Sequence, residues 1–367
     1  MKRKYTYLVF FCLTILTGCE MNQEPKTYQL FVGTYTDGKS EGIYSYSFNA
    51  DTGELSTKTL AAALPNPSFL KISPNNKNLY AVQETADFDS LGGGVTAFRI
   101  KEGLLELQNS IGTGGAHPCH VSLLGEKQLV ASNYSGGNVM IANLEDDGSI
   151  VDSNQIINHR SMDTISKPHA HMAKGMEGEL FVSDLGLGAI KRYKNNNGQF
   201  IVGNQPSIDL PDGAGPRHFV FSENGKFLYV INELNSTITV FRRTNENVYD
   251  EVETQSTLSN DFSGDSYCAD IHLSKDGKFL YGSNRGENTI VVFKVDKVSG
   301  KLDLVGREAV RGDWPRNFSL DPSNDYLLVA NQKSNNISIF KRNAELGTLT
   351  FLKDEKLPSP VCLEFLH

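Results

Sequence analysis

The sequence predicts an all-β fold, a seven-bladed β-propeller, and three observations support it. A short apolar strand recurs at a spacing of about 50 residues, a period typical of propeller blades of about four strands. A proline stands upstream of most copies. The first copy lacks its opening strand, and a strand of the missing kind lies near the C-terminal end. We therefore expect the C-terminal strand to complete blade one.

The segment 215–241 contains a full unit of this repeat. A Gly-Pro turn leads into an alternating strand at 218–221, and a polar turn at 223–226 follows. A more apolar strand at 227–231 and a β-branched strand at 237–241 come next. The alternation puts successive side chains on opposite faces of the sheet.

The second strand of the unit recurs along the chain. Its copies are LYAVQE (79–84), LVASNY (129–134), LFVSDL (180–185), LYVINE (228–233), LYGSNR (280–285) and LLVANQ (327–332). The upstream prolines are Pro67, Pro118, Pro168, Pro216 and Pro315, and Cys268 takes this place in the remaining unit. The incomplete unit lies at 28–60, and Pro360–Phe365 matches its missing strand. Pairing the two would close the ring and remove the open sheet edges that invite aggregation.

The first residues have the pattern of an exported lipoprotein. Basic residues at 2–4 precede an apolar run at 5–16, which is too short to span a bilayer but suits a signal peptide. The run ends in Leu-Thr-Gly before Cys19, which resembles a bacterial lipoprotein processing site. We expect a signal peptide at 1–18, a tether at 19–27 that begins with a lipidated Cys19, and a propeller at 28–367. The protein would then face the periplasm or the cell exterior, and ordinary cleavage with secretion is the alternative.

Charge narrows the classes of partner. The formal net charge of −8 becomes −11 when the three basic residues at 2–4 are lost with the signal peptide. An acidic chain without a basic run argues against nucleic acid as a partner. We expect contact with the membrane only through the lipid anchor, and a monomeric protein.

Two adjacent positions of the repeat differ in how much their residue type varies. The residue that closes the second strand is always an amide or an acid, which favours a structural role in bonding turns and neighbouring blades: Gln83, Asn133, Asp184, Asn232, Asn284 and Asn331. The next position varies: Glu84, Tyr134, Leu185, Glu233, Arg285 and Gln332. Because the repeat keeps its scaffold and varies at this one position, we expect the variable residues to serve a purpose other than the fold.

The residues that follow the prolines, or Cys268 in its unit, vary as well: Ser68, Cys119, His169, Arg217, Ala269 and Arg316. In a propeller these first strands line the central channel. Arg217, Arg285 and Arg316 are therefore expected to converge on one mouth, with Glu233 and a histidine nearby. Simple ion pairs of the arginines with Glu233 or Glu84 are the alternative.

Other chemistries find less support. Cys119, Cys268 and Cys362 are an odd number without paired spacing, so we expect small buried thiols. The histidines could suggest zinc, but no nearby carboxylates complete a shell: His117, His120, His169 and His171. No Gly-x-Ser-x-Gly elbow is present to supply a serine nucleophile.

Five motifs together resemble the seven-bladed propeller lactonases. They are Pro168-His169-Ala170-His171, Gly215-Pro216-Arg217-His218, Val230-Ile231-Asn232-Glu233-Leu234, Ser283-Asn284-Arg285-Gly286 and Pro315-Arg316-Asn317-Phe318. This family includes the propeller-type bacterial 6-phosphogluconolactonase and the fungal 3-carboxy-cis,cis-muconate lactonizing enzyme. The resemblance covers the chain from Tyr28 to its C-terminal end.

The resemblance implies a site without metal or cofactor, built from one histidine, two arginines and one glutamate. By motif these fall on His171, Arg217, Glu233 and Arg285. His169 is the fallback for the histidine, because the chain is two residues short just after His171. The secondary contacts to substrate would be His169, Arg316, Asn331 and Gln332.

The implied activity is hydrolysis of a sugar-acid lactone, as in 6-phosphogluconolactonase, with a small anionic lactone or sugar acid as the ligand. Glu233 or His171 would act as the base, and the arginines would stabilise negative charge. The same groups also suit lactone formation by a muconate-type cycloisomerase. A non-catalytic envelope propeller that binds an anionic sugar or a protein partner is the further alternative. The export pattern departs from the cytosolic 6-phosphogluconolactonases and leaves the choice of lactone open.

Overall fold

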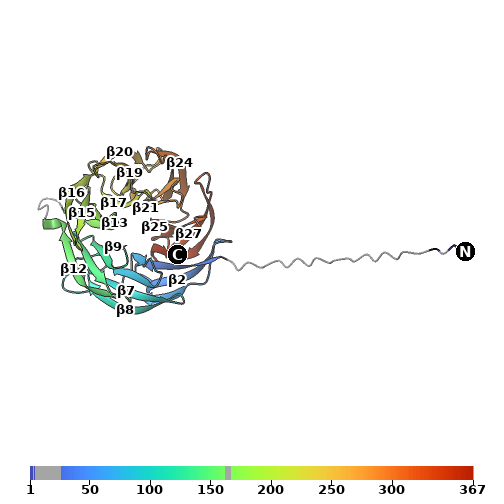
Figure 1. The fold of residues 1–367 in the computed structure, drawn as a ribbon, viewed down its shortest axis with the longest axis horizontal. Coiled ribbons are helices and arrows are strands. Elements are labelled where there is room, and N and C mark those ends of the chain that lie inside the picture. The colour runs from blue at the N-terminus through green and yellow to red at the C-terminus, as the bar shows by residue number, and fades with distance from the viewer. Residues whose placement is uncertain (3, 5–25, 162–166, 367) are drawn as a thin grey trace.

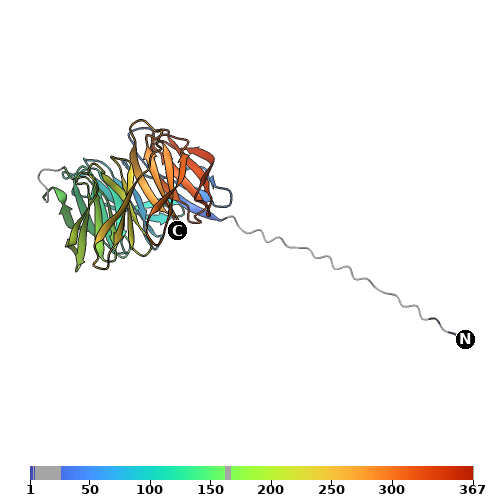
Figure 2. The ribbon, with the colours of Figure 1, turned by 90° about the horizontal axis from the view of Figure 1, so that it is seen from above.

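The computed structural model describes residues 1, 2, 4, 26–161 and 167–366, and from Thr27 onward the chain forms a closed ring of seven antiparallel sheets (Figure 1). In the view turned by 90°, the blades stand side by side across the ring (Figure 2). The all-β, seven-bladed prediction is confirmed. The predicted signal peptide and the lipidated Cys19 lie outside the described residues, apart from positions 1, 2 and 4.

Each blade is built from consecutive strands of the chain, and blade one also includes the last strand. Blade one contains β1 (Thr27–Thr34), β2 (Gly42–Asn49), β3 (Glu54–Leu55), β4 (Thr59–Ala63) and β29 (Pro360–Phe365). Blade two contains β5 (Leu70–Ile72), β6 (Asn78–Gln83), β7 (Gly94–Lys101) and β8 (Leu104–Gly112). Blade three contains β9 (Pro118–Leu124), β10 (Gln128–Asn133), β11 (Asn138–Leu144) and β12 (Ile150–Asn158). Blade four follows the 3₁₀ turn η1 (His159–Ser161) and contains β13 (Ala170–Met176), β14 (Glu179–Asp184), β15 (Ala189–Asn196) and β16 (Gln199–Asp209).

The last three blades repeat the pattern. Blade five contains β17 (Pro216–Phe221), β18 (Phe227–Asn232), β19 (Thr237–Arg243) and β20 (Tyr249–Ser256). Blade six contains β21 (Tyr267–Leu273), β22 (Phe279–Arg285), β23 (Thr289–Val295) and β24 (Leu302–Ala309). Blade seven contains β25 (Pro315–Leu320), β26 (Tyr326–Asn331), β27 (Asn336–Arg342) and β28 (Leu349–Lys356).

The hydrophobic core is divided among the gaps between adjacent blades. One cluster, for example, packs Tyr229 and Ile231 of blade five against Ile271 and Leu280 of blade six. The second strand of each blade is covered on both faces, and every residue of β18 is buried. This double burial explains why the second strands read as continuous apolar runs in the sequence.

The ring closes through β29. This strand pairs antiparallel with β1, with Leu30 opposite Phe365 and Gly33 opposite Cys362, as predicted. On its other sides β29 contacts β25 of blade seven and β5 of blade two. In Figure 1 the blue strands of blade one and the red C-terminal strand therefore lie side by side. Among the described residues, no helix is long and apolar enough to cross a membrane.

Candidate active site

In every blade except blade two, the innermost strand carries a β-bulge near its start, and the bulges place the candidate side chains. In blade five Pro216 pairs with Asn232 and His218 with Ile231, so Arg217 is the extra residue. The same shift leaves Arg316 unpaired between Pro315 and Asn317. A bulge redirects the side chain of its extra residue and locally interrupts the ladder. Proline fits just before it, since the first residue of an edge strand need not donate to the sheet.

The bulge in blade four identifies the histidine that corresponds to these arginines. Ala170 pairs with Asp184 and Met172 with Ser183, so His171 is the extra residue. His171 thus occupies the structural position of Arg217 and Arg316, and the count from Pro168, which put His169 there, was wrong by two residues. In blade six the bulge lies between Cys268 and Ile271, and Cys268 pairs with Asn284 in the place of a proline, as predicted.

Glu233 lies between two arginines. Its Oε2 is 3.0 Å from Arg217 Nε, and its Oε1 is 3.1 Å from Arg285 Nη2. The arginines are almost fully buried, whereas the Glu233 side chain is 18% exposed. Burial alone would raise the pKa of Glu233, but the Arg285 and Arg217 charges outweigh it and hold that pKa below the usual value. The carboxylate is therefore ionised at neutral pH and accessible from solvent.

The two arginines are anchored by backbone carbonyls as well as by Glu233. Arg217 Nη1 donates to the Ala269 carbonyl at 2.5 Å, and Arg285 Nη2 donates to the Cys268 carbonyl at 3.0 Å. Burial and the neighbouring Arg217 lower the pKa of Arg285 to about 10. Both guanidinium groups thus stay charged at neutral pH and are fixed in orientation.

Arg316 forms a second cluster with residues of blades one and two. Its guanidinium carbon lies 5.3 Å from the centre of the Tyr35 ring, and the Tyr35 hydroxyl donates to Glu84 Oε2 at 2.8 Å. The surrounding protein would lower the pKa of Arg316, but Tyr35, Glu84 and Glu233 raise it above its usual value. The mouth therefore holds three arginine charges against the carboxylates of Glu84 and Glu233.

The two candidate histidines both contact Tyr134. His171 is 4% exposed, and its ring centre is 5.6 Å from that of Tyr134 and 5.2 Å from that of His218. Burial and the Arg217 charge lower the pKa of His171 well below its usual value, so it is neutral at pH 7. His169 stacks on Tyr134 at 4.4 Å, and its Nδ1 donates to the Tyr134 carbonyl at 3.0 Å.

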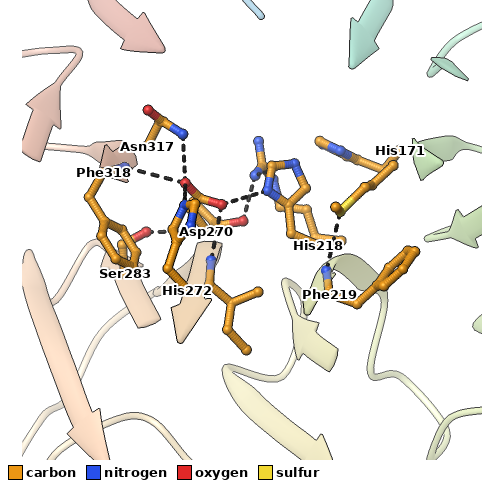
Figure 3. A network of polar contacts seen from close by, with 12 residues as sticks. His171, His218, Phe219, Asp270, His272, Ser283, Asn317 and Phe318 are labelled. Atoms are coloured by element: carbon orange, nitrogen blue, oxygen red, sulfur yellow. Dashed lines mark hydrogen bonds and ion pairs between the residues drawn. The ribbon is translucent and has the colours of Figure 1, made fainter. Parts of the chain in front are cut away.

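Below the bulged residues lies a polar layer centred on Asp270 (Figure 3). Asp270 Oδ1 is 2.8 Å from His218 Nδ1, and Oδ2 is 2.9 Å from His272 Nε2. The carboxylate also accepts from the Asn317 amide at 2.6 Å and from the Phe318 backbone N–H at 3.3 Å. Burial would raise the pKa of Asp270, but the two histidines keep it well below the usual value. A buried carboxylate therefore connects blades five, six and seven beneath the arginines.

The predicted amide contacts differ in their surroundings. Asn331 is fully buried, and its Nδ2 donates to Ser338 Oγ at 2.9 Å and to the Val310 carbonyl at 3.5 Å. Gln332, one residue later, is partly exposed, and its Oε1 is buried without a hydrogen-bond partner. Contact with substrate remains a prediction for both, and the bonds of Asn331 also fit the structural role that the repeat suggested.

Comparison with known proteins agrees with this geometry. The family described as "Lactonase, 7-bladed beta-propeller" matches residues 29–365. A Bacillus subtilis protein named 6-phosphogluconolactonase is 36% identical, over 92% of this chain and 98% of its own. A Formosa agariphila protein of the same name is 38% identical, over 89% of this chain and 96% of its own. The chain belongs to the seven-bladed β-propeller lactonase family.

Solved structures extend the likeness from sequence to geometry. A putative 6-phosphogluconolactonase from Bacteroides fragilis superposes with a TM-score of 0.84 at 35% identity, covering 93% of this chain and 98% of its own. A periplasmic gluconolactonase from Pseudomonas aeruginosa superposes with a TM-score of 0.88 at 31% identity, covering 93% and 99%. The lactonase family resemblance in the sequence is thereby confirmed.

Two residues at the mouth of this lactonase-family site were missed from the sequence. Tyr35 occupies the same repeat position as Glu84 and Glu233, but it belongs to the incomplete first unit. Trp314 is the single tryptophan of the chain. Its ring centre lies 5.2 Å from the guanidinium carbon of Arg285 and 3.2 Å from Lys333 Nζ. Its φ of 68° is unusual for a bulky residue and typical of strained functional sites. A lone tryptophan just before Pro315 was the available signal.

A large cavity of the lactonase fold lies away from this chemistry. A cavity of about 580 Å³ opens between blades five and six against the turns at 222–224 and 274–277, and none of the candidate residues lines it. The predicted small thiols are confirmed, because Cys119, Cys268 and Cys362 are buried and free. In the described part of the chain, no three His, Cys, Asp or Glu side chains are grouped to hold a metal ion.

Proposed function

We propose that the chain hydrolyses the lactone of a sugar acid at the mouth formed by His171, Arg217, Glu233 and Arg285. The observation that carries this proposal is the ionised, partly exposed Glu233 carboxylate between two buried arginines. A lactonase needs a base for water and positive charge for the oxygen anion that develops on the carbonyl. Both are present within one cluster.

The chemistry follows from the charges. Glu233 takes a proton from water as the water oxygen bonds to the lactone carbonyl carbon, and Arg217 and Arg285 stabilise the resulting oxyanion. The ring C–O bond then breaks, and the proton passes to the departing alcohol oxygen. General-base catalysis of this kind contributes about 10²–10⁴-fold. The neutral His171 packs beside Tyr134 and His218, and its proposed role is to hold or move a proton at the same centre.

The substrate is proposed to be anionic. Three arginines face two glutamates at the mouth, so the cluster attracts a carboxylate or phosphate although the chain as a whole has a formal charge of −8. Arg316, Gln332 and His169 would contact the parts of the substrate away from the reacting bond. Asn331 would contribute least, since its side chain is fully buried and its amide nitrogen is already bonded within the protein. The names of the relatives include both a 6-phosphogluconolactone and a gluconolactone activity, so both substrates are candidates.

A lactone panel tests this proposal. The protein from Glu20 onward should hydrolyse a sugar-acid lactone, with or without a 6-phosphate, faster than the uncatalysed background in pH-stat titration. The Glu233→Gln variant should lose at least about 100-fold in kcat while binding of the product acid is largely kept. Wild-type turnover in that variant would reject the mechanism, and conversion of a muconate instead of a lactone would favour the cycloisomerase alternative. Binding without turnover of any lactone would favour a sugar-binding propeller.

We also propose that a lipid on Cys19 anchors the enzyme as a monomer at the cell envelope. The sequence of the first 19 residues supports this location, and one structural relative is named a periplasmic gluconolactonase. Ring closure leaves β1 paired on both sides, with β2 and β29, so this strand offers no free edge to a second copy, which fits a monomer. Cys19→Ser should release the protein into the soluble fraction, and a soluble cytosolic wild type that retains Met1 would contradict the proposal.

A further inference from the structure

The strongest unassigned cluster is the pair His218 and Asp270, directly beneath Arg217. Both side chains are about 5% exposed, and His218 Nδ1 lies 2.8 Å from Asp270 Oδ1. On the other side of the ring, His218 Nε2 lies 3.4 Å from Arg217 Nη1. The imidazole thus stands between a carboxylate and the guanidinium that pairs with Glu233.

These partners determine where the proton of His218 lies. A carboxylate only accepts hydrogen bonds and a guanidinium only donates them. Nδ1 of His218 therefore carries the proton and donates to Asp270, and the lone pair of Nε2 faces Arg217. Burial and the Arg217 charge lower the pKa of His218 to about 4, so the ring keeps this neutral form at neutral pH.

We propose that His218 and Asp270 are positioning residues that hold Arg217 in its orientation toward Glu233 and the reacting carbonyl. Asp270 fixes the tautomer and the angle of the imidazole, and the imidazole gives Arg217 Nη1 an acceptor beside the Ala269 carbonyl. The Asp270 charge also offsets the Arg217 charge in the protein interior. The inference rests on the proposed lactonase function and adds two residues to the proposed catalytic set of His171, Arg217, Glu233 and Arg285.

Asp270 is itself rigidly held, as a positioning residue must be. His272, the Asn317 amide and the Phe318 backbone N–H bind Oδ2, and the backbone N–H of Ile271 donates to Oδ1 at 3.0 Å. Bonds of this kind from surrounding strands fix a group well enough for catalytic geometry, where a displacement of about 1 Å can cost 10²-fold in rate.

A second buried histidine–aspartate pair serves as an internal control. His159 Nδ1 lies 2.6 Å from Asp184 Oδ2, and its Nε2 lies 2.9 Å from the Tyr193 hydroxyl. That pair is fully buried and contacts none of the three arginines in the described structure. Removing it tests what loss of a buried His–Asp pair does to the protein without acting on Arg217.

Three substitutions at His218 separate positioning from packing. In His218→Gln the amide oxygen can replace Nε2 as acceptor for Arg217, but the bond to Asp270 is weakened. In His218→Asn the amide N–H can replace Nδ1 as donor to Asp270, but Arg217 loses its acceptor. His218→Phe removes both contacts and keeps the ring. The chain from Glu20 onward is the protein for all assays.

We expect kcat/KM for the best lactone to fall about 10–100-fold in His218→Asn and His218→Phe, mainly through kcat, and less than 10-fold in His218→Gln. The melting temperature should instead be higher for His218→Asn than for His218→Gln. A purely structural histidine would rank the variants in the same order for activity and for stability. Asp270→Asn should resemble His218→Asn in activity, because an amide N–H facing Nδ1 imposes the wrong tautomer.

A double-mutant cycle with Arg217→Ala completes the test. If His218 acts through Arg217, His218→Asn should cost nothing further in that background, whereas His159→Asn should multiply with Arg217→Ala. Activity that follows the melting temperature across the His218 series, or full multiplication with Arg217→Ala, would overturn the inference. Wild-type turnover by Arg217→Ala and Glu233→Gln would instead reject the proposed function. Loss in those two variants with no effect at His218 would reject the positioning role alone.

Discussion

Two neighbouring rings of residues at the same mouth of the channel do different work. Several residues that close the second strands bond the end of the preceding blade: the Asn133 amide donates to the Thr113 carbonyl at 2.9 Å and the Asn284 amide to the Thr257 carbonyl at 3.1 Å. The residues one position later point into the site, as Glu233 and Arg285 do. A single step along the chain thus separates stability from chemistry.

The difference explains why one position is uniform and the next is diverse. Six of the seven units have an amide or an acid at the first position, and Asn133, Asn284 and Asn331 each donate there to a backbone carbonyl at the end of the preceding blade. The next side chain faces the shared mouth, where each blade contributes something different. Repeat proteins can therefore hold a scaffold constant while a neighbouring position gains function.

The largest expected effect comes from breaking the ring to which both sets belong. Deleting 358–367 removes β29 and exposes the apolar face of β1, including Leu30 and Val32. We expect loss of the cooperative thermal transition and of all lactonase activity. A synthetic 358–367 peptide should restore part of both. A truncated protein that melts within a few degrees of the full chain would contradict the role of β29 in closure.

The second prediction concerns Arg285, one of the variable positions directly after the second strands. Arg285→Ala should weaken binding of a carboxylated or phosphorylated ligand by roughly 2–5 kcal/mol, because its partner Glu233 is left without one of its two cations. The dissociation constant of the product acid, measured by calorimetry, checks this. An uncharged lactone of the same size is the control, and equal weakening for both ligands would mean that Arg285 supports the fold and does not read charge.

The third prediction concerns Asn284, the residue directly before Arg285. Asn284→Ala should lower the free energy of unfolding by about 1–3 kcal/mol, since the Thr257 carbonyl and Glu287 lose a buried donor. Turnover at a temperature where the variant is folded should stay close to wild type. A large fall in kcat without a fall in stability would show that the two rings are not separate in function.

The smallest effect is a dependence of stability on pH that comes from the histidines under the mouth. Burial lowers the pKa of His218 to about 4 and those of His120 and His171 well below 6.5. The unfolded chain takes up protons on them as the pH falls below about 6.5, while the folded chain does not. Their stabilising contribution is complete above that pH. It falls toward pH 4 by up to about 1.4 kcal/mol per pH unit for each histidine.

Urea unfolding at a series of pH values measures this slope. His218→Asn should make it shallower, because one group with a lowered pKa is gone. The lowered pKa values of Glu233 and Asp270 act in the same direction, since their stabilisation is present above the unfolded carboxyl pKa and is lost as pH falls further. Stability independent of pH between 7 and 5 would mean that the buried histidines take up protons at the same pH in the folded and unfolded chain, so that burial does not lower their pKa values.

The fold could be predicted from the sequence because the same strand pattern recurs in six units. The sequence also placed Arg217, Glu233 and Arg285 together, since all three occupy fixed positions in adjacent units. It left His169 as a fallback for His171, because in blade four Ala170, and not Pro168, pairs with the strand-closing Asp184, so that counting from the proline stops two residues too early. Asp270 was missed for a related reason: the bulge in blade six spans two residues, and the count from Cys268 stops at Ala269.

The place of β29 in the ring has a consequence for the timing of synthesis. Leu363 on this strand donates its backbone N–H to Asn317, and Asn317 in turn donates to Asp270 beneath Arg217. The strand leaves the ribosome after every other strand of the propeller, and its partner β1 leaves first. The ring, and the support under Arg217, can therefore be completed only after nearly all of the chain has been made. Such late pairing over a long sequence separation favours slow folding, which would suit the export that we propose above.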